Sequence, residues 1–462
     1  MGTNMRKLTG LFLIVLLAGC GGSDGGVSAP PDPVDETGEC STNGQKQFVL
    51  DNLYAWYLWN DLLPADLSIA DYASPEELII RVTADFGPQK IVDGQEVPID
   101  RFSFVRSQQS EDDFLEGTLG ELFGFSYRFV DDAATDFRIV RVFSGSPADV
   151  GGLARGQRIL TLNGRSVTEV AGSEGISTFF SNNPTVEFEI ERTGANDFTT
   201  ITKAVITIEP VAQWRLIDRG DGIPPVGYMQ LDTFIDTANP RFEAAFAEFR
   251  QAGVTDVILD LRYNGGGLVR TAELLGDYLG AGVAPGEVFS RTEFNADRAA
   301  QYNEISNITN LQAFRDQTIN LSRLVVVATR GTASASELVT NGMIPHVDVA
   351  IVGDNTFGKP VGQIGLTFCE KIMRPTSFRI ANADGDGDYF DGLPVDCAAP
   401  DDLSAEIGAD DDPNVVAAMS VLNTGACPAV ATLEGQFAPQ FRPTYQQPDR
   451  RGTPAREYLD AF

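Results

Sequence analysis

Residues 254–261 read VTDVILDL, an almost continuous apolar run of the kind that forms a strand buried on both faces of a sheet. Two similar runs follow, LVVVA at 324–328 and VDVAIV at 347–352. A helical pattern over 240–252 precedes the first run. Its apolar face consists of Phe242, Ala245, Phe246 and Phe249. Because strands alternate with helices, we expect a mostly parallel sheet, with any ligand site at the carboxyl ends of its strands.

The sequence on either side of this sheet predicts further domains, so the fold class is α/β multidomain. Residues 40–116 predict a helical N-terminal domain, residues 117–210 a β-rich domain of short strands, and residues 211–430 the α/β core. In the first domain, helical spacing over 48–59 predicts one helix. The segment 74–86 predicts another, opened by a serine N-cap, a proline and a capping-box glutamate.

Both ends of the chain are predicted to lie outside the folded part. Two basic residues precede an apolar run that is too short to span a bilayer and ends in Leu-Ala-Gly-Cys at Cys20. This resembles the signal of bacterial lipoproteins, which implies removal of residues 1–19 and lipidation of Cys20. An ordinary secretory signal is the alternative. Residues 20–39 read as a flexible tether, and residues 431–462 as an extended tail.

Composition excludes several classes of function. The chain of 462 residues carries 34 Lys+Arg and 65 Asp+Glu, a net charge of −31, whereas nucleic-acid binding needs clustered basic side chains. Its single histidine, His346, excludes a multi-histidine zinc site. An acidic stretch at 382–388 resembles half of a calcium loop, but Leu393 stands where that loop needs glutamate, so we expect a solvated hairpin. We predict no metal site and no cofactor.

Four cysteines follow Cys20, namely Cys40, Cys369, Cys397 and Cys427. An even number in an exported chain predicts two disulfides. The sequence leaves three connectivities open, and free buried thiols are the alternative.

The β-rich segment contains two informative patterns. A glycine-led turn, GFSY at 124–127, opens a strand, and SPADVGGL at 146–153 precedes a strand that ends in an Asn-Gly turn at 163–164. Together they resemble a PDZ domain. The resemblance implies that a peptide adds as a strand beside the segment after the glycine turn. Its carboxylate would be captured by a loop that consists of Gly124, Phe125 and Ser126. A domain of this shape that serves only packing or gating is the alternative.

Each of the three core strands is followed by a loop of small residues. The first, DLRYNGGG at 260–267, contains glycines that let the backbone approach a phosphate or an oxyanion. The second, TRGTASASEL at 329–338, places Ser334 at the start of a helix, as an exposed nucleophile or as a plain N-cap. The third, GDNTFGKPVGQ at 353–363, contains Lys359, which on its own is most simply a surface lysine.

Together, the three loops resemble those of the carboxy-terminal processing proteases, or tail-specific proteases, a family of serine–lysine peptidases with a PDZ domain. The resemblance covers residues 117–430, and it implies that Ser334 is the nucleophile and Lys359 the general base. Gln363 matches the position that orients the lysine in some members. Glu337 matches an acidic position beside the nucleophile in others.

The same resemblance implies an oxyanion hole made of the N–H groups of Ala335 and Gly266. Two positions differ from the family pattern. Gly265 stands where many members have proline, which leaves the exact glycine open, and Pro360 stands where glycine is usual.

The chemistry of the residues is consistent with these roles. A serine hydroxyl needs a neighbouring base, and a lysine can serve only when it is neutral, so its pKa must fall by roughly 3 units from about 10.4. Burial can supply such a shift, and Phe357 and Val361 flank Lys359 as a candidate dry lining. The rival base is His346, which follows the end of the helix that Ser334 begins, well over 10 Å away.

We therefore predict a serine endopeptidase of the bacterial cell envelope. Its substrates would be proteins or peptides that the PDZ domain recognises by their C-termini. The lipid on Cys20 would hold it at a membrane, and the absence of an aspartate directly after Cys20 resembles lipoproteins of the outer membrane, facing the periplasm or the cell surface. The alternative function is a PDZ scaffold that binds C-termini and carries a weak or inactive protease core.

Overall fold

The structure is a computed structural model that describes residues 38–428, apart from residues 93, 132, 221 and 310–316. The predicted signal, Cys20, most of the tether and the tail lie outside the described residues. None of the described helices is long and apolar enough to cross a membrane.

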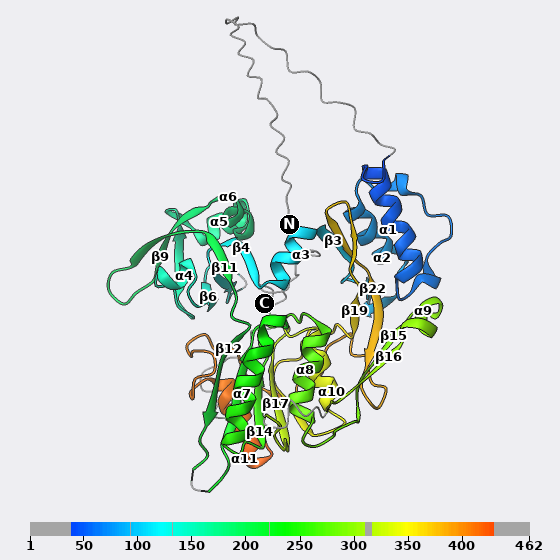
Figure 1. Cartoon of the computed structure of the whole chain (residues 1–462). Coiled ribbons are helices and arrows are strands. Elements are labelled where there is room, and N and C mark those ends of the chain that lie inside the picture. Colours follow the sequence, from blue (N-terminus) through cyan, green and yellow to red (C-terminus); the bar gives the residue numbers. More distant parts are fainter. Residues whose placement is uncertain (1–37, 93, 132, 221, 310–316, 429–462) are drawn as a thin grey trace, which may run out of the picture.

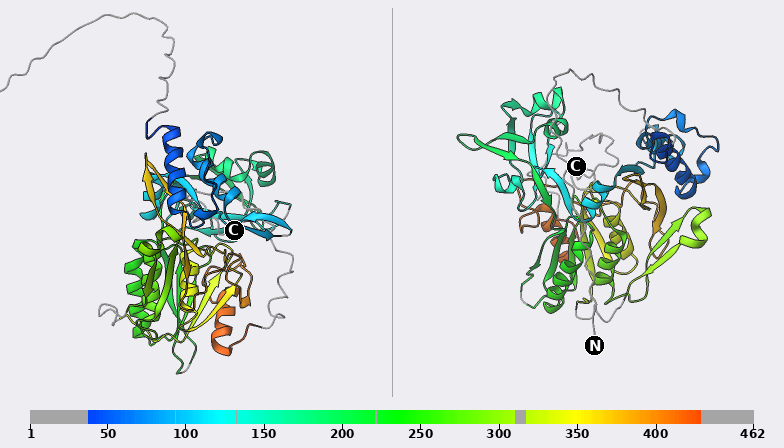
Figure 2. Two further views of the ribbon diagram at one scale, coloured as in Figure 1. Left: turned by 90° about the vertical axis from the view of Figure 1, so that its right-hand side faces the viewer. Right: turned by 45° about the horizontal axis from the view of Figure 1, so that its top comes forward.

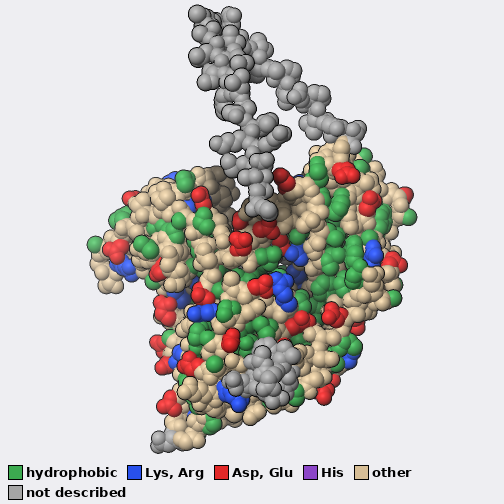
Figure 3. Space-filling view, viewed as in Figure 1, with side chains coloured by type: hydrophobic (Ala, Val, Ile, Leu, Met, Phe, Trp, Pro, Cys, Tyr) green, Lys and Arg blue, Asp and Glu red, His purple; other side chains and the backbone are tan. Residues whose placement is uncertain are grey.

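Three parts of the chain are distinguished below by the predicted ranges: the N-terminal part (residues 38–116), the β-rich part (residues 117–210) and the core (residues 211–428). Figure 1 shows the first two on opposite sides above the core, the N-terminal part on the right and the β-rich part on the left. The predicted fold class is confirmed, because helices begin the chain, short strands fill its middle, and a mostly parallel sheet with helices forms the core. Acidic side chains are spread over all three parts in Figure 3, as the net charge predicts.

The N-terminal part packs two helices together and adds strands beyond them. Its elements are α1 (Thr42–Trp56), α2 (Pro75–Phe86), β1 (Gln89–Val92), β2 (Gln95–Pro98), β3 (Phe104–Ser107) and α3 (Gln108–Leu115), with 3-10 turns at Asn60–Leu62 and Ile69–Asp71. Helix α2 starts as predicted, with the Ser74 hydroxyl accepting from the Glu77 N–H. Helix α1 starts earlier and ends earlier than predicted, because Ser41 caps it by accepting from the Gly44 N–H. The β1–β2 hairpin and β3 were not foreseen.

The β-rich part is a curved sheet with the strand order β10-β9-β7-β6-β5, which leaves β5 at an edge. Its elements are β4 (Thr118–Leu122), β5 (Phe125–Phe129), β6 (Phe137–Val142), α4 (Pro147–Val150), β7 (Arg158–Leu162), β8 (Arg165–Ser166), α5 (Val167–Ser173), α6 (Ile176–Asn182), β9 (Thr185–Ile190), β10 (Asp197–Thr202) and β11 (Ala204–Thr207). The predicted Asn-Gly turn is present, since Asn163 and Gly164 both have positive φ, 51° and 74°, and β7 pairs with β8 around them.

The core is built on a sheet with the strand order β12-β13-β14-β17-β18-β23, parallel except for the β12–β13 pair. These strands are β12 (Val211–Ile217), β13 (Val226–Leu231), β14 (Asp256–Asp260), β17 (Arg323–Ala328), β18 (Asp348–Gly353) and β23 (Cys397–Ala398). The three predicted strands are therefore β14, β17 and β18, and they lie next to one another.

Helices cover both faces of this sheet, as Figure 2 shows. On one face lie α7 (Asn239–Gln251), α8 (Val269–Gly280) and α10 (Ala335–Met343), and on the other lies α11 (Pro413–Thr424). The predicted apolar face of α7 is fully buried. Alternate residues of β14 lie on opposite faces of the sheet. Leu259 packs in the hydrophobic cluster with α7, α8 and α10, and Ile258 packs in the cluster with α11. Burial on both faces explains why the strands read as continuous apolar runs.

Smaller sheets connect the core to the N-terminal part. One has the order β16-β15-β22-β19 and the other the order β20-β21-β3, so that β3 of the N-terminal part completes a sheet of the core. Their core elements are β15 (Val288–Phe294), α9 (Ala296–Tyr302), β16 (Glu304–Asn307), β19 (Val361–Gln363), β20 (Leu366–Phe368), β21 (Lys371–Arg374) and β22 (Thr376–Ala381), and a 3-10 turn at Asp236–Ala238 precedes α7.

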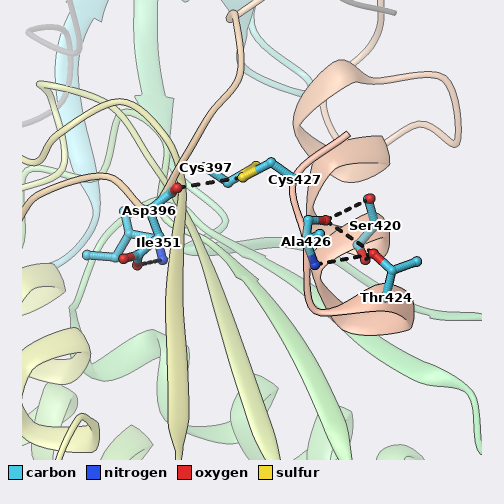
Figure 4. Close-up of a disulfide and its surroundings, with 7 residues drawn as sticks. All are labelled: Ile351, Asp396, Cys397, Ser420, Thr424, Ala426 and Cys427. Carbon is cyan, nitrogen blue, oxygen red and sulfur yellow. Dashed lines mark hydrogen bonds between the residues drawn. A yellow bond between two sulfur atoms is a disulfide. The ribbon is translucent and has the colours of Figure 1, made fainter. Parts of the chain in front are cut away.

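The four cysteines form two disulfides, as predicted, and the structure selects one of the three connectivities. Cys40, just before α1, is joined to Cys369 in the β20–β21 hairpin. Cys397 on β23 is joined to Cys427, which follows α11. Figure 4 shows this second bridge beside the end of α11. Each bridge fixes a segment near an end of the described chain to the core.

Candidate active site

The three loops singled out in the sequence meet at one edge of the core sheet. They follow β14, β17 and β18, which are neighbouring parallel strands, so their carboxyl ends lie side by side. Direct contacts join the loops: the Ala333 N–H donates to the Asn264 carbonyl at 3.0 Å, and the Phe357 N–H donates to the Thr332 carbonyl at 2.9 Å. The parallel topology thus brings together residues that are about a hundred positions apart in the chain.

Ser334 lies at the turn from β17 into α10 with φ 57° and ψ −114°. Ser334 is the N-cap of α10 and forms the expected capping box with Glu337, but an ordinary N-cap residue has extended backbone and Ser334 does not. Positive φ in a residue other than glycine is strained, and such strain is concentrated at sites where the surrounding structure imposes it. Here the constraint includes Gly266, where an added Cβ would lie 2.8 Å from the Ser334 Cβ and 2.9 Å from the Ala335 nitrogen. A sharp strand-to-helix turn of this kind is how nucleophilic serines are held exposed above a sheet.

Glu337 joins the serine turn to the lysine loop. Its carboxylate is completely buried and accepts four hydrogen bonds. Oε2 accepts the Ser334 N–H at 2.9 Å and the Lys359 N–H at 2.8 Å. Oε1 accepts the Thr356 hydroxyl at 2.5 Å and the Gly358 N–H at 2.7 Å. Burial raises the pKa of Glu337 above its usual value, although these four donors act in the opposite direction.

The amine of Lys359 points to Gln363. Lys359 Nζ donates to Gln363 Oε1 at 2.8 Å, and Gln363 Nε2 donates in turn to the carbonyls of Phe102 at 2.7 Å and Arg374 at 2.9 Å. The phenyl ring of Phe102 also lies beside the amine, with its centroid 5.6 Å from Nζ. Of the predicted lining, Val361 is fully buried and Phe357 is half-buried. The lysine is therefore half-buried among apolar and amide groups.

The predicted oxyanion donors lie close to Ser334 but differ in their hydrogen bonding. The Ala335 N–H and the Gly265 N–H make no hydrogen bond within the described part of the chain. In contrast, the Gly266 N–H donates to the Asn264 side-chain oxygen at 2.9 Å. Gly266 thus lies beside Ser334, and its N–H is already used in the hydrogen bond to Asn264.

His346 lies away from these groups. It follows the C-terminal end of α10, whereas Ser334 begins that helix. Its Nε2 is 2.8 Å from the carbonyl oxygen of Val288 on β15. The nine residues of α10 span roughly 13 Å at 1.5 Å per residue. His346 therefore lies at the opposite end of α10 from Ser334.

The other predicted binding loop lies in the β-rich part. Gly124 has φ 93°, and an added Cβ would lie 2.2 Å from the Ser146 Cβ, so only glycine fits there. The next residues, Phe125 and Ser126, begin the edge strand β5 and are buried. Phe180 of α6 packs on Phe125, with ring centroids 5.7 Å apart, so a helix flanks this edge strand.

The acidic stretch at 382–388 folds as a turn. The side-chain oxygen of Asn382 accepts the N–H groups of Asp384 at 3.1 Å and Asp386 at 2.9 Å. Across the described residues, no group of three or more His, Cys, Asp or Glu is arranged to hold a metal ion.

Two neighbours of the site were missed by the sequence analysis, namely Phe102 and Asn264. Asn264 stands inside a quoted motif, so its amide was available as a signal. Phe102 lies in the N-terminal part, 257 residues before Lys359 in the chain, with no motif of its own. Only the pairing of β3 with β21 brings its segment to the lysine loop.

Comparison with known proteins identifies two regions of the chain, one in the N-terminal part and one in the core. Residues 44–104 match the peptidase S41 N-terminal domain, and residues 225–392 match peptidase family S41. The carboxyl-terminal-processing protease of Synechocystis sp. is 29% identical over 250 residues, which cover 52% of this chain and 54% of that protein. The carboxy-terminal processing protease CtpA of Bacillus subtilis is 24% identical over 297 residues, which cover 64% and 59%. The chain thus spans a little over half the length of the curated relatives it matches.

A solved structure shares the fold. A Bacteroides fragilis protein assigned to the S41 proteases superposes with a TM-score of 0.66 at 23% identity, over 82% of this chain and 97% of that one. The matched N-terminal domain contains Phe102, and the matched peptidase domain contains Ser334, Glu337, Lys359 and Gln363. The chain thus contains two domains of peptidase family S41, the N-terminal domain at residues 44–104 and the peptidase domain at residues 225–392.

Proposed function

We propose that the protein is a serine endopeptidase that uses Ser334 and Lys359. The observation that carries the proposal is the Glu337 carboxylate, which binds the backbone N–H groups of both residues through one oxygen atom. It fixes the nucleophile turn and the lysine loop against each other, in addition to the backbone hydrogen bond between Phe357 and Thr332. Preorganisation of this kind is what an acyl-transfer site requires.

The reaction proceeds in two halves. In the first, the Ser334 hydroxyl attacks the carbonyl carbon of the scissile peptide bond and passes its proton to the neutral amine of Lys359. The resulting ammonium protonates the leaving amine as the C–N bond breaks, which leaves an acyl-enzyme. In the second half, Lys359 removes a proton from water, the hydroxide attacks the ester, and the proton returns to Ser334.

The negative oxygen of the tetrahedral intermediate needs backbone donors. The Ala335 N–H stands at the start of α10, where the helix dipole favours negative charge. The second donor is a glycine of the 260–267 loop, either Gly265, whose N–H has no acceptor, or Gly266 after its bond to Asn264 is released. Each such donor is typically worth about 3–4 kcal/mol in the transition state.

The β-rich part would select substrates by their C-termini, as a PDZ domain does. Supporting features are the edge strand β5, the glycine turn at Gly124 that opens it, and the helix α6 beside it. A peptide would add as a further strand, with its carboxylate at the turn of Gly124, Phe125 and Ser126. The signal-like leader and Cys20 support a lipid-anchored protein of the bacterial envelope, with proteins or peptides as substrates.

The test is mass spectrometry of a peptide library varied at the C-terminus, incubated with wild type, Ser334→Ala, Lys359→Ala and His346→Ala. Wild type and His346→Ala should cleave, whereas the other two should lose roughly 10⁴-fold or more in rate, as single members of such catalytic sets do. Cleavage by Lys359→Ala would overturn the assignment of the base. Binding of peptides by wild type without cleavage of any would favour the alternative, a PDZ scaffold with an inactive core.

A further inference from the structure

A short segment of the N-terminal part, residues 100–103 (Asp-Arg-Phe-Ser), lies against the lysine loop of the core. We propose that Phe102 is a positioning residue of the site: its ring excludes water from the Lys359 amine, and its carbonyl sets the direction of the Gln363 amide. The inference rests on the proposed function and extends the site to a part of the chain in which the sequence analysis found nothing catalytic.

The first observation is the place of the ring. Only 2% of the Phe102 surface is exposed, and its centroid lies 5.6 Å from Lys359 Nζ. Phe357 of the lysine loop meets the Phe102 ring edge-on at 6.2 Å between centroids. The Phe102 ring thus forms an aromatic wall beside the amine, where a smaller residue at 102 would leave room for water.

The second observation concerns the amide of Gln363. Its NH₂ group donates to the carbonyls of Phe102 and Arg374, at 2.7 and 2.9 Å, so both N–H bonds are used. Its oxygen is therefore left to accept from Lys359 Nζ at 2.8 Å. If the Gln363 amide were turned over, its N–H groups would face the Lys359 amine, which is itself a donor. The Phe102 carbonyl is one of the two groups that decide this direction.

The segment itself is held firmly. Asp100 is completely buried and accepts the N–H groups of Phe102 at 2.9 Å and Ser103 at 3.1 Å. The same carboxylate accepts the hydroxyl of Thr376 on β22 at 3.0 Å, and the Thr376 N–H donates to the Ser103 hydroxyl at 2.9 Å. Phe102 is therefore fixed relative to β22, the strand that pairs with β19, where Gln363 lies.

The ring has two opposite effects on the protonation of Lys359. Its face attracts an ammonium group, but weakly for a phenyl ring near the limit of about 6 Å. Exclusion of water disfavours the ammonium and can lower a lysine pKa by as much as 3–5 units. The charged groups around the site are Glu337, Arg101, Arg374, Glu111 and Asp100. Of these groups, Arg101 contacts the Phe102 ring, with Cζ 5.6 Å from the centroid, and it also contacts Phe357. The other four keep their own hydrogen bonds when Phe102 is replaced, so the loss of water exclusion should dominate.

The experiment compares Phe102→Ala with Phe102→Leu, which keeps an apolar wall, in the full chain. The first readout is the pH dependence of kcat/KM with a peptide substrate. Phe102→Ala should move the rising limb to higher pH by about one unit and lower the rate at pH 7 about tenfold, since one pKa unit is a factor of ten. Phe102→Leu should stay close to wild type. A lower rate with an unshifted limb would mean a structural role only and would overturn the proposal.

The second readout does not require peptidase activity. Trace acetylation with acetic anhydride across a pH series, followed by mass spectrometry, reports the protonation of each lysine, with Lys90 and Lys371 as internal references. Phe102→Ala should shift the profile of Lys359 to higher pH and leave the references unchanged. An unshifted profile of Lys359 would overturn the inference. If wild type cleaves no peptide, the proposed function fails. The acetylation profile still shows in that case whether Phe102 affects the protonation of Lys359.

Discussion

The β-rich part and the N-terminal part are joined to the core by different kinds of contact. The β-rich part is joined through two arginines, of which Arg155 is buried and Arg128 is partly exposed. Arg155, with 3% of its side chain exposed, donates to Asp401 Oδ1 at 2.6 Å and to the Tyr263 hydroxyl at 3.2 Å. Arg128 donates to the other oxygen of Asp401 at 3.0 Å. Burial alone would raise the pKa of Asp401, but these arginines together with Arg262 hold it well below its usual range.

The N-terminal part is joined to the core by a shared sheet and a covalent link as well as by charges. Strand β3 pairs with β21, and the Leu58 N–H donates to the Thr376 carbonyl at 2.8 Å. A disulfide between Cys40 and Cys369 adds the covalent link. Ion pairs also cross this interface, between Lys90 and Asp391, Lys371 and Glu76, and Arg374 and Glu111. The backbone pairing and the disulfide involve no ionisable group, so their contribution should depend little on pH or salt.

Each part reaches a different loop of the candidate site. Tyr263, which the arginines of the β-rich part contact, belongs to the glycine loop that carries Gly265 and Gly266. Phe102 of the N-terminal part contacts the lysine side. The oxyanion side and the base side are thus supported by separate parts of the chain, the first by the β-rich part and the second by the N-terminal part. Glu337, in the core, holds the serine turn to the lysine loop.

The largest effect on stability is expected at the contact between Arg155 of the β-rich part and Asp401 of the core. Arg155→Ala leaves Asp401 buried with one arginine fewer, and breaking a buried pair typically costs about 3–5 kcal/mol of the free energy of unfolding. Urea denaturation at pH 7 measures this loss. Arg165→Ala is the matched control, because it removes an arginine from exposed pairs of the same β-rich part and should change little. Equal losses in the two variants would show that the burial of Arg155 adds nothing to the free energy of unfolding.

The N-terminal interface should respond to removal of its covalent link. Replacing Cys40 and Cys369 together by serine should lower the free energy of unfolding by about 2–4 kcal/mol, because the bridge restricts the unfolded chain. The loss should be the same at low and high salt, in contrast to an interface held by exposed charges. Denaturation at two salt concentrations checks both points, and a strongly salt-dependent loss would contradict the comparison.

Glu337→Gln tests the connection between the two sides. Glutamine offers one acceptor oxygen, so it must lose either the bonds to Ser334 and Lys359 or those to Thr356 and Gly358. We expect kcat to fall about a hundredfold, the effect of a displacement of roughly 1 Å at a catalytic centre. Thr356→Val removes only one bond of the second pair and should cost less in a peptidase assay. A larger effect of Thr356→Val than of Glu337→Gln would show that the bond to Thr356 matters more for activity than the bonds to Ser334 and Lys359.

The comparison also explains what sequence could and could not predict. The strands, α7, the Asn-Gly turn and the three loops follow local patterns, and parallel topology then brings the loops together. The start of α1 was missed because the Ser41 cap lies outside the apolar repeat. Phe102 and the pairing of the cysteines depend on how β3 meets β21, a long-range contact that leaves no local pattern. The hydrogen bond from the Gly266 N–H to Asn264 depends on the rotamer of the Asn264 side chain, which a sequence motif does not encode.

The smallest expected effect is on the pH dependence of stability. The folded pKa of Asp401 is depressed, so its contribution to stability is complete above the unfolded pKa of about 3.9 and is lost as pH falls toward the folded value. The difference in the free energy of unfolding between wild type and Asp401→Asn should therefore be constant from pH 7 to pH 5. It should then shrink by up to about 1.4 kcal/mol per pH unit below pH 4. Urea denaturation between pH 7 and pH 3 measures the difference. Parallel curves for the two proteins down to pH 3 would show that Asp401 is not stabilised as an ion, and the charged contact assigned to the interface of the β-rich part would fail.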